Sequence, residues 1–438
     1  MEFKQERSSP ELELTWPKYG LKESPYSTSP TRLLGILPIQ QVFSGRKEEV
    51  LALKRIINSS NSTRNLVVGE YGVGKTTFTN YVRWDLTSKS AVSKYLTTSA
   101  EIKVQPEWNA TTFLLSTLSS IYNASIIFDW RGKGIKTTSV QKLKEYVSIN
   151  KLRSFDGSIA GFGAGYSESR NNPPLLSPEI LENLLQEVCH EFIENGKQII
   201  IPYDNLENIE LEKLGEIFKS IRDYLQIEGL HSIFIGPPDV ISALEAHGQV
   251  HSVFGRPLIL KPLTEGNILE ILEKRCEFLK IDGGRYIPPY KPETVRELYS
   301  KLNHNIRFTF KVLEDATLNA EGLAPCQISM NDIVAVQEKE KKEIMSSLTD
   351  TQLKIVTALL ERPILSQKEL SSSTKIGATN LTEPVRELVE RGLITEKRDK
   401  DDKRIKYVRL SDNSYLKLFF DSKKVEQKTE KQDKLKES

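Results

Sequence analysis

The sequence predicts an α/β domain built on a parallel sheet, followed by a smaller unit of helices that ends in a β-hairpin. Between Leu66 and Leu279, short apolar runs alternate with helical patterns, which is typical of parallel sheets covered by helices. A glycine-rich loop joins the first run to a helix, and near the C-terminus three helical patterns precede two alternating segments. The length of 438 residues suits two or three domains.

Composition narrows the class of protein. Hydrophobic residues make up 38% of the chain, charged residues 27%, and the formal net charge is +2, so any nucleic-acid contact must come from a local basic patch. The three cysteines (Cys189, Cys276 and Cys326) show neither disulfide nor zinc spacing, which favours a reducing cytoplasm. No apolar run approaches the length of a membrane span, and the first residues are too charged for a signal peptide.

The first motif is the segment Gly69–Thr76, a full match to G-x-x-x-x-G-K-[ST] between an apolar run and a helical pattern. Its glycines let backbone N–H groups approach phosphate oxygens at a helix N-terminus. Lys75 can reach the β- and γ-phosphates, and the Thr76 hydroxyl can bind Mg²⁺. The alternative is an ordinary glycine-rich turn. The predicted ATP-binding residues are Gly69, Gly72, Val73, Gly74, Lys75, Thr76 and Thr77, with Arg46 placed by analogy at the adenine end of the pocket.

A second acidic motif follows another apolar run, Gln198–Tyr203. Asp204 at its carboxyl end is expected to hold Mg²⁺ opposite Thr76, because ligands of parallel sheets gather at that edge. The alternative is a strand-end turn. Asn205 stands where many ATPases have a water-orienting glutamate, and Glu207 is the nearest carboxylate that could take that role. Pro202 lacks a backbone donor, so the strand is expected to end or lie at an edge there.

The order of elements resembles the AAA+ superfamily, in particular the archaeal ATPases near the origin-recognition initiators and the STAND switch ATPases. The resemblance is carried by Gly69–Thr76, Asp204–Glu207, Ser232–Gly236, Phe254–Arg256 and Asn305–Arg307. It implies a P-loop AAA+ sheet with a helical lid.

By that resemblance, Arg256 looks like an arginine finger that reaches the nucleotide of a neighbouring subunit, which implies a homo-oligomer. Arg307 looks like the lid arginine that senses the γ-phosphate. Each has an alternative as a surface arginine or a packing ion pair. Gly236 offers no polar side chain where the family places a water-positioning residue, and with Asn205 this implies slow hydrolysis or a nucleotide switch.

The C-terminal unit is predicted to be a winged helix. Helical patterns over Thr349–Glu361 and Thr379–Arg391 flank a short helix that begins with capping-box spacing at Ser366, and Gly392 closes the third helix. The arrangement resembles the winged helix of multiple-antibiotic-resistance-type (MarR) regulators.

Such folds place the third helix in the DNA major groove and the wing on phosphates. The alternative is a protein-interaction module. The residues expected on the third helix are Thr379, Asn380, Thr382, Glu383 and Arg386, and those on the wing are Lys397, Arg398, Lys400, Lys403 and Arg404.

The expected organisation has six parts: an extended arm at 1–40, a P-loop core at 41–262, a helical lid at 263–327, a linker helix at 328–347, the winged helix at 348–418 and a charged tail at 419–438. A glycine-rich insertion at 153–170 is expected to form a β-hairpin. The arm could pack on the first core or dock a protein partner.

The function expected from these motifs is that of an ATP- and Mg²⁺-binding ATPase, a hydrolase that binds double-stranded DNA in replication initiation or a related DNA transaction. Two alternatives stay open. One is a STAND-type nucleotide switch or transcriptional regulator, and the other is a target-selecting ATPase of a mobile element.

Overall fold

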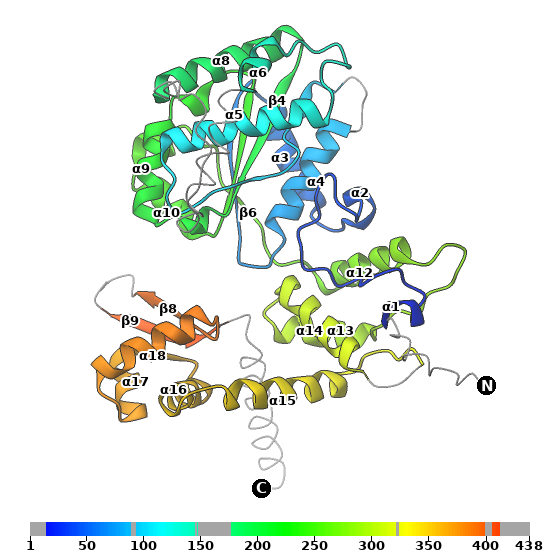
Figure 1. Cartoon of the computed structure of the whole chain (residues 1–438), viewed down its shortest axis with the longest axis vertical. Helices are drawn as coiled ribbons and strands as arrows, with labels where there is room; N and C mark the ends of the chain where they lie inside the picture. Colours follow the sequence, from blue (N-terminus) through cyan, green and yellow to red (C-terminus); the bar gives the residue numbers. More distant parts are fainter. Residues whose placement is uncertain are drawn as a thin grey trace, which may run out of the picture. The chain divides into compact units, whose positions relative to one another are not determined.

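The computed structural model describes residues 15–88, 93–144, 147, 177–320, 324–398 and 405–411. It divides into two compact units, one formed by Ser29–Phe278 and the other by Met1–Thr28 with Leu279–Ser438 (Figure 1). The insertion expected at 153–170 lies outside the described residues. None of the described helices combines the length and the apolar character needed to span a bilayer.

The first unit is built on a parallel sheet of strand order β2-β4-β5-β1-β6, with β3 beside β4. Its strands are β1 (Thr63–Val68), β2 (Tyr95–Thr97), β3 (Ile102–Lys103), β4 (Gln198–Asp204), β5 (Leu230–Gly236) and β6 (Leu258–Ile259). Each of the described pairings is parallel, which confirms the predicted α/β domain with a parallel sheet.

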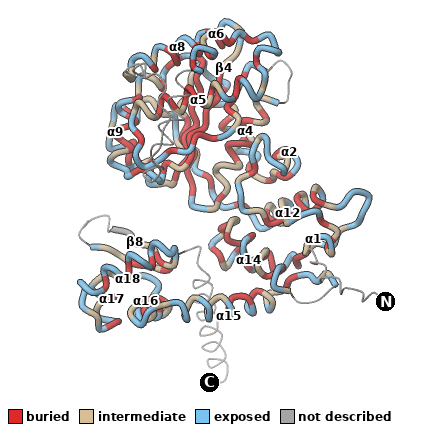
Figure 2. Tube along the Cα trace, viewed as in Figure 1, coloured by how far each residue is buried: buried red, intermediate tan, exposed pale blue. Residues whose placement is uncertain are grey.

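Helices cover both faces of this sheet, because alternate side chains of each strand point to opposite sides. On β4, Ile199 and Ile201 join one buried cluster and Ile200 joins the other. Figure 2 shows the buried residues gathered along the strands and the inner sides of the helices. The first cluster includes α5 (Ala110–Ile127), α8 (Pro178–Glu194), α9 (Leu211–Ile221) and α10 (Asp239–Glu245), and the second includes α3 (Lys47–Asn58) and α4 (Lys75–Ser88).

Within the described residues, this unit has four further helices that are short or peripheral. They are α2 (Ile39–Val42), α6 (Thr138–Lys142), α11 (Gly248–His251) and α12 (Glu265–Leu279), of which α12 runs on into the second unit.

The structure corrects the expectation for Pro202, because β4 continues through it as an inner strand. The Gln198 N–H donates to Lys94 and the Ile199 N–H to Gly229, so successive nitrogens alternate between the two neighbouring strands. By that alternation the Pro202 nitrogen points toward the β2–β3 side, where residues 98–101 are unpaired. The segment beside β4 therefore forms two strands, β2 and β3, which are separated where Pro202 offers no donor.

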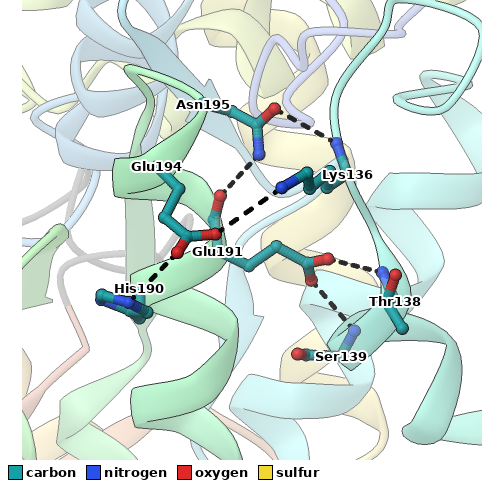
Figure 3. A network of polar contacts seen from close by, with 7 residues as sticks. All are labelled: Lys136, Thr138, Ser139, His190, Glu191, Glu194 and Asn195. Atoms are coloured by element: carbon teal, nitrogen blue, oxygen red, sulfur yellow. Dashed lines mark hydrogen bonds and ion pairs between the residues drawn. The ribbon is translucent and has the colours of Figure 1, made fainter.

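A buried carboxylate fixes the start of α6. Glu191 on α8 accepts the backbone N–H groups of Thr138 at 2.7 Å and Ser139 at 3.0 Å (Figure 3). Asn195, one turn further along α8, accepts the N–H of Lys136 at 3.4 Å. The two Glu191 contacts satisfy N–H groups in the first turn that the helix itself leaves without partners, so the network has a structural role.

The second unit begins with a helical layer and part of the N-terminal arm. The Tyr19 hydroxyl donates to the Cys326 carbonyl at 2.9 Å, and the Lys22 N–H donates to Leu279 at 2.8 Å. Tyr19 and Tyr26 are buried, so this stretch of the arm packs within the second unit and not on the sheet. The helices of this layer are α1 (Thr15–Lys18), α13 (Pro292–Lys301), α14 (Ile306–Asn319) and α15 (Met330–Ser346).

The winged helix forms as predicted. Its antiparallel sheet has the order β7-β9-β8, and Ile355, Leu359, Leu388 and Val408 lie in its core. Its elements are α16 (Asp350–Glu361), β7 (Ile364–Ser366), α17 (Gln367–Thr374), α18 (Ala378–Glu390), β8 (Ile394–Arg398) and β9 (Lys406–Leu410).

Local signals set the helix ends of this domain. The Ser366 side chain and the Glu369 carboxylate form the expected capping box. At the end of α18, Gly392 has a φ of 69° and its N–H donates to Val389, while the Leu393 N–H donates to Leu388. This is a Schellman motif, which explains why a glycine follows the helix.

Candidate functional site

The phosphate loop between β1 and α4 has a backbone that only glycines allow. Gly72 and Gly74 have φ values of 79° and 92°. A Cβ at Gly69 would lie 2.8 Å from the Leu260 carbonyl oxygen and 3.0 Å from Val73 Cγ1. The G-x-x-x-x-G-K-[ST] spacing is therefore matched by the geometry that the motif requires.

Lys75, the first residue of α4, extends across this loop. Its Nζ donates to the carbonyl oxygens of Gly69 at 2.9 Å and Glu70 at 3.2 Å. The ammonium group thus lies over the mouth of the loop, where the β- and γ-phosphates of a nucleotide would bind. Phosphate oxygens can take the place of these two carbonyls as acceptors.

Thr76 and Asp204 meet at the carboxyl edge of the sheet. The Thr76 hydroxyl donates to Asp204 Oδ2 at 2.8 Å, and the Asn205 N–H donates to Oδ1 at 3.0 Å. Burial raises the pKa of Asp204, while the Thr76 and Asn205 hydrogen bonds oppose that rise.

A hydroxyl and a carboxylate are the hard oxygen ligands that suit Mg²⁺, so the residues present fit the ion. Within the described residues, no group of three His, Cys, Asp or Glu side chains is placed to hold a metal. The remaining ligands of a magnesium ion at Thr76 and Asp204 would therefore be phosphate oxygens and water.

After Asp204, the chain turns sharply. Asn205 has a φ of 65° and leads into the single turn η1 (Leu206–Asn208), which carries Glu207 with an exposed side chain. At the end of β5, a Cβ at Gly236 would lie 2.9 Å from Val240 Cγ2 and 3.1 Å from Leu206 Cβ. The packing of η1 and α10 thus leaves no room for a side chain at Gly236.

Arg46 lies behind the phosphate loop. It is buried, its backbone has a φ of 58°, and its Nη2 donates to the Val73 carbonyl at 2.8 Å. Its Nη1 lies 3.7 Å from the Glu49 carboxylate. The structure therefore brings Arg46 to the loop that the sequence analysis assigned to nucleotide binding, where it supports the main chain.

The two candidate arginines lie in different units. Arg256 is exposed and precedes β6, whose Leu258 pairs with Val67. It therefore lies alongside the middle of β1, before the phosphate loop, and just ahead of the strand at the end of the sheet. Arg307 is half-buried in the first turn of α14, where the Asn305 side chain accepts the Phe308 N–H at 3.0 Å as a cap.

Sequence reasoning missed a polar cluster beside α4. Arg83 is fully buried, and desolvation lowers its pKa to about 10. It donates to the Thr97 hydroxyl at 2.8 Å and to Asn80 Oδ1 at 2.7 Å, and it also contacts the Thr98 carbonyl. Asn80 in turn donates toward Glu101 Oε1 at 3.5 Å, and Glu101 is 9% exposed.

The same cluster holds the segment that enters the first unit. Asn80 Nδ2 donates to the Thr31 carbonyl at 3.1 Å, and the Thr31 N–H donates to the Thr77 hydroxyl at 3.3 Å. A signal existed in the sequence, because Thr76, Asn80 and Arg83 recur at helical spacing on the side of α4 that faces the sheet.

The third helix of the winged domain presents the expected face. Arg386 forms ion pairs with Glu383 and with Glu390, the latter at 3.6 Å, so its charge is partly neutralised within the helix. On the wing, Lys397 and Arg398 lie on β8, paired in register with Tyr407 and Lys406. Lys400, Lys403 and Arg404 lie outside the described residues. The exposed candidates on α18 are Thr379, Asn380, Thr382, Glu383 and Arg386.

Two protein-family models match separate parts of the chain. Residues 46–256 match the model described as the KAP family P-loop domain, and residues 348–406 match the model of the MarR family. The chain thus carries a P-loop NTPase domain followed by a MarR-type winged helix, as the sequence predicted. No curated protein matches the sequence.

Several solved structures are similar to this chain at low sequence identity and with TM-scores below 0.5. The Aeropyrum pernix ORC2 protein in its ADPNP–ADP complexes is 15% identical, with 93% of this chain and 99% of that chain covered and a TM-score of 0.47. The Aeropyrum pernix ORC1 protein in complex with DNA is 16% identical, with 91% of this chain and 96% of that chain covered and a TM-score of 0.48. Cdc6p from Pyrobaculum aerophilum is 13% identical, with 92% of this chain and 99% of that chain covered and a TM-score of 0.40.

Proposed function

We propose that this chain, in which a KAP-type P-loop domain precedes a MarR-type winged helix, is an ATPase that binds Mg²⁺–ATP, hydrolyses it slowly and holds double-stranded DNA. The observation that carries the nucleotide part is the 2.8 Å hydrogen bond from Thr76 to Asp204, beside a loop in which Gly69 has no room for a side chain and Gly72 and Gly74 have positive φ values. An ordinary glycine-rich turn has no need of a buried carboxylate on the threonine that follows the lysine.

Different residues of the site would bind the phosphates and the metal ion. The loop N–H groups and Lys75 would hold the phosphates, while Thr76 and Asp204 would hold Mg²⁺, which neutralises charge on the β- and γ-phosphates when bound. Arg46 keeps the loop in shape through the Val73 carbonyl. Slow turnover fits a site in which Asn205 is a neutral amide and Gly236 has no room for a side chain.

The winged helix is proposed as the DNA-binding part. The support is its MarR match, a third helix whose polar side chains are exposed, and the basic residues of the wing. The glutamates beside Arg386 favour contacts to base edges over simple phosphate binding on that helix. A protein-binding winged helix remains the alternative.

We also propose that the protein forms a homo-oligomer, and we propose a location and a biological process for it. Arg256 is exposed at the edge of the sheet, as an arginine that reaches into a neighbouring subunit must be. We place the protein in the cytoplasm, with replication initiation or a related DNA transaction as its process. The described part of the arm buries Tyr19 and Tyr26 in its own chain, so a protein partner there would use other residues.

A nucleotide switch that regulates transcription is the second candidate, favoured by Asn205 and the crowded Gly236. A target-selecting ATPase of a mobile element is the third. Measured steady-state hydrolysis, with and without DNA, separates the first two, because a switch would bind nucleotide with almost no turnover. A pull-down of a partner enzyme would favour the third.

The decisive experiment uses the Lys75→Ala variant, with the exposed Lys219→Ala as its matched control. ATP binding is measured by calorimetry, and DNA footprints are recorded with ATP, ADP and no nucleotide. We expect Lys75→Ala to lose ATP binding and any ATP-dependent change in the footprint, while Lys219→Ala keeps both. Equal ATP affinity in the two variants would refute the proposed site.

A further inference from the structure

We propose that Glu101 is the general base of ATP hydrolysis in this protein, in the role that Asn205 cannot fill. This proposal rests on the proposed ATPase function. It assigns the role to a residue 103 positions before Asp204 in the sequence and not to Glu207, the nearest carboxylate along the chain.

The register of the sheet places Glu101 on the same face as Asp204. Ile102 pairs with Tyr203 and Lys103 pairs with Asp204 across β3 and β4. Paired residues of parallel strands point to the same side, and neighbours along a strand point to opposite sides. Ile102 and Tyr203 lie in the cluster under α5 and α8, so Glu101 and Asp204 face the other way, toward α4.

A contact to the phosphate-loop helix confirms this orientation. Asn80 Nδ2 donates toward Glu101 Oε1 at 3.5 Å, and Asn80 lies four residues after Thr76, on the same side of α4. The side chains of Glu101 and Thr76 therefore face the same region, between α4 and the carboxyl end of β4.

The break in the neighbouring strand makes this placement possible. Residues 98–101 leave the sheet where Pro202 offers no N–H, and β3 then resumes the pairing. Glu101 closes this short loop with its side chain buried, while Arg83 holds the Thr98 end. The loop is thereby fixed at both ends beside the metal-binding pair.

The alternative carboxylate is placed differently. Glu207 is exposed on η1, and within the described residues no hydrogen bond or ion pair is recorded for its side chain. A base that must hold one water in line with a phosphate needs a fixed position shielded from bulk solvent. The buried Glu101 meets that requirement and the exposed Glu207 does not.

In the proposed hydrolysis, the water oxygen bonds to the γ-phosphorus. The bond from that phosphorus to the β–γ bridging oxygen breaks and leaves its electron pair on ADP. One water proton passes to the Glu101 carboxylate and then to solvent. Lys75 and the loop N–H groups stabilise the charge that develops on the phosphates.

The test compares Glu101→Gln with Glu207→Gln in the full chain. Single-turnover and steady-state hydrolysis are measured together with ATP affinity and thermal unfolding. We expect Glu101→Gln to hydrolyse ATP at least about 100-fold more slowly, with ATP affinity and unfolding temperature close to wild type. Glu101→Asp, which keeps a carboxylate at this position, should restore part of the rate that Glu101→Gln loses.

The assignment would be overturned by wild-type rates in Glu101→Gln, by a parallel loss of binding and stability, which indicates a purely structural role, or by the rate loss in Glu207→Gln instead. A wild-type protein that binds ATP without turnover would also overturn it and favour the switch. A wild-type protein that fails to bind ATP would count against the proposed function itself, so the two failures are distinguishable.

Discussion

Thr76 and Asp204 are 128 residues apart in the sequence, and the Thr76 hydroxyl lies 2.8 Å from the Asp204 carboxylate. Two strands of the parallel sheet end at this point, which brings the phosphate loop and the acidic motif to one edge. The hydrogen bond holds the two expected Mg²⁺ ligands together before a nucleotide arrives, so the site is organised in advance.

The first prediction concerns the burial of Asp204. Because its pKa is raised in the folded protein, the folded state binds more protons than the unfolded state between the two pKa values. Its ionised form therefore costs stability at neutral pH, and the cost fades as the pH falls through the folded pKa. We expect Asp204→Asn to unfold at the same or a higher urea concentration than wild type at pH 7, and to bind Mg²⁺–ATP at least about tenfold more weakly.

Urea titrations between pH 5 and pH 8 and calorimetry with Mg²⁺–ATP would measure both effects. The exposed Asp223→Asn is the control, and it should leave nucleotide affinity unchanged. If Asp204→Asn bound Mg²⁺–ATP as tightly as wild type, the metal role of this carboxylate would be wrong.

The second prediction concerns the space at the end of β5. A serine at position 236 would restore a polar side chain, but its Cβ would lie 2.9 Å from Val240 Cγ2. We expect Gly236→Ser to lower the free energy of unfolding by about 1–3 kcal/mol through overpacking. Gly255→Ser is the matched control, because its Cβ would meet only the Arg64 carbonyl oxygen, at 3.7 Å. Equal stability of the two variants in urea would contradict the crowding argument.

The third prediction concerns His231, which is buried in β5. Its Nδ1 lies 2.8 Å from the Thr63 hydroxyl and its Nε2 lies 3.0 Å from Gln198 Oε1. Burial lowers the pKa of His231 to about 4, with the charges of Lys94 and Arg64 adding to the effect. The imidazole therefore stays neutral in the folded state at a pH where the unfolded chain binds a proton.

This proton uptake on unfolding makes stability fall as the pH drops from about 6.5 toward 4, by roughly 3 kcal/mol at most. Urea titrations across this range should show a shallower pH dependence in His231→Gln than in wild type. The exposed His190→Gln should keep the wild-type slope. An unchanged slope in His231→Gln would show that other groups set the acid sensitivity.

The fourth prediction concerns the wing of the C-terminal domain. We expect the double variant Lys403→Ala with Arg404→Ala to weaken binding to all duplex sequences alike and to flatten the salt dependence, by up to about 0.9 log units per lost phosphate contact. Fluorescence anisotropy over a series of salt concentrations would measure the slope. Lys354→Ala, exposed on the first helix of the domain, is the control. An unaltered slope in the double variant would indicate that the wing faces protein.

Much of the architecture was readable from residues close together in the chain. The phosphate loop, the capping box at Ser366 and the glycine after α18 each depend on a few neighbouring residues, because a turn or a helix end satisfies its own backbone groups. The parallel sheet followed from apolar runs that alternate with helices. These features were predicted and then confirmed.

Other features were decided only when distant segments paired. Whether Pro202 could lie inside a sheet depended on where its neighbouring strand broke, and Glu101 became a candidate base only because that break brought it beside Asp204. The arm packs with residues near Cys326 for the same kind of reason. The amino-acid order determines which chemistry is present, but strand register and burial decide which carboxylate shares a face with the metal-binding pair, since those depend on contacts between residues about a hundred positions apart.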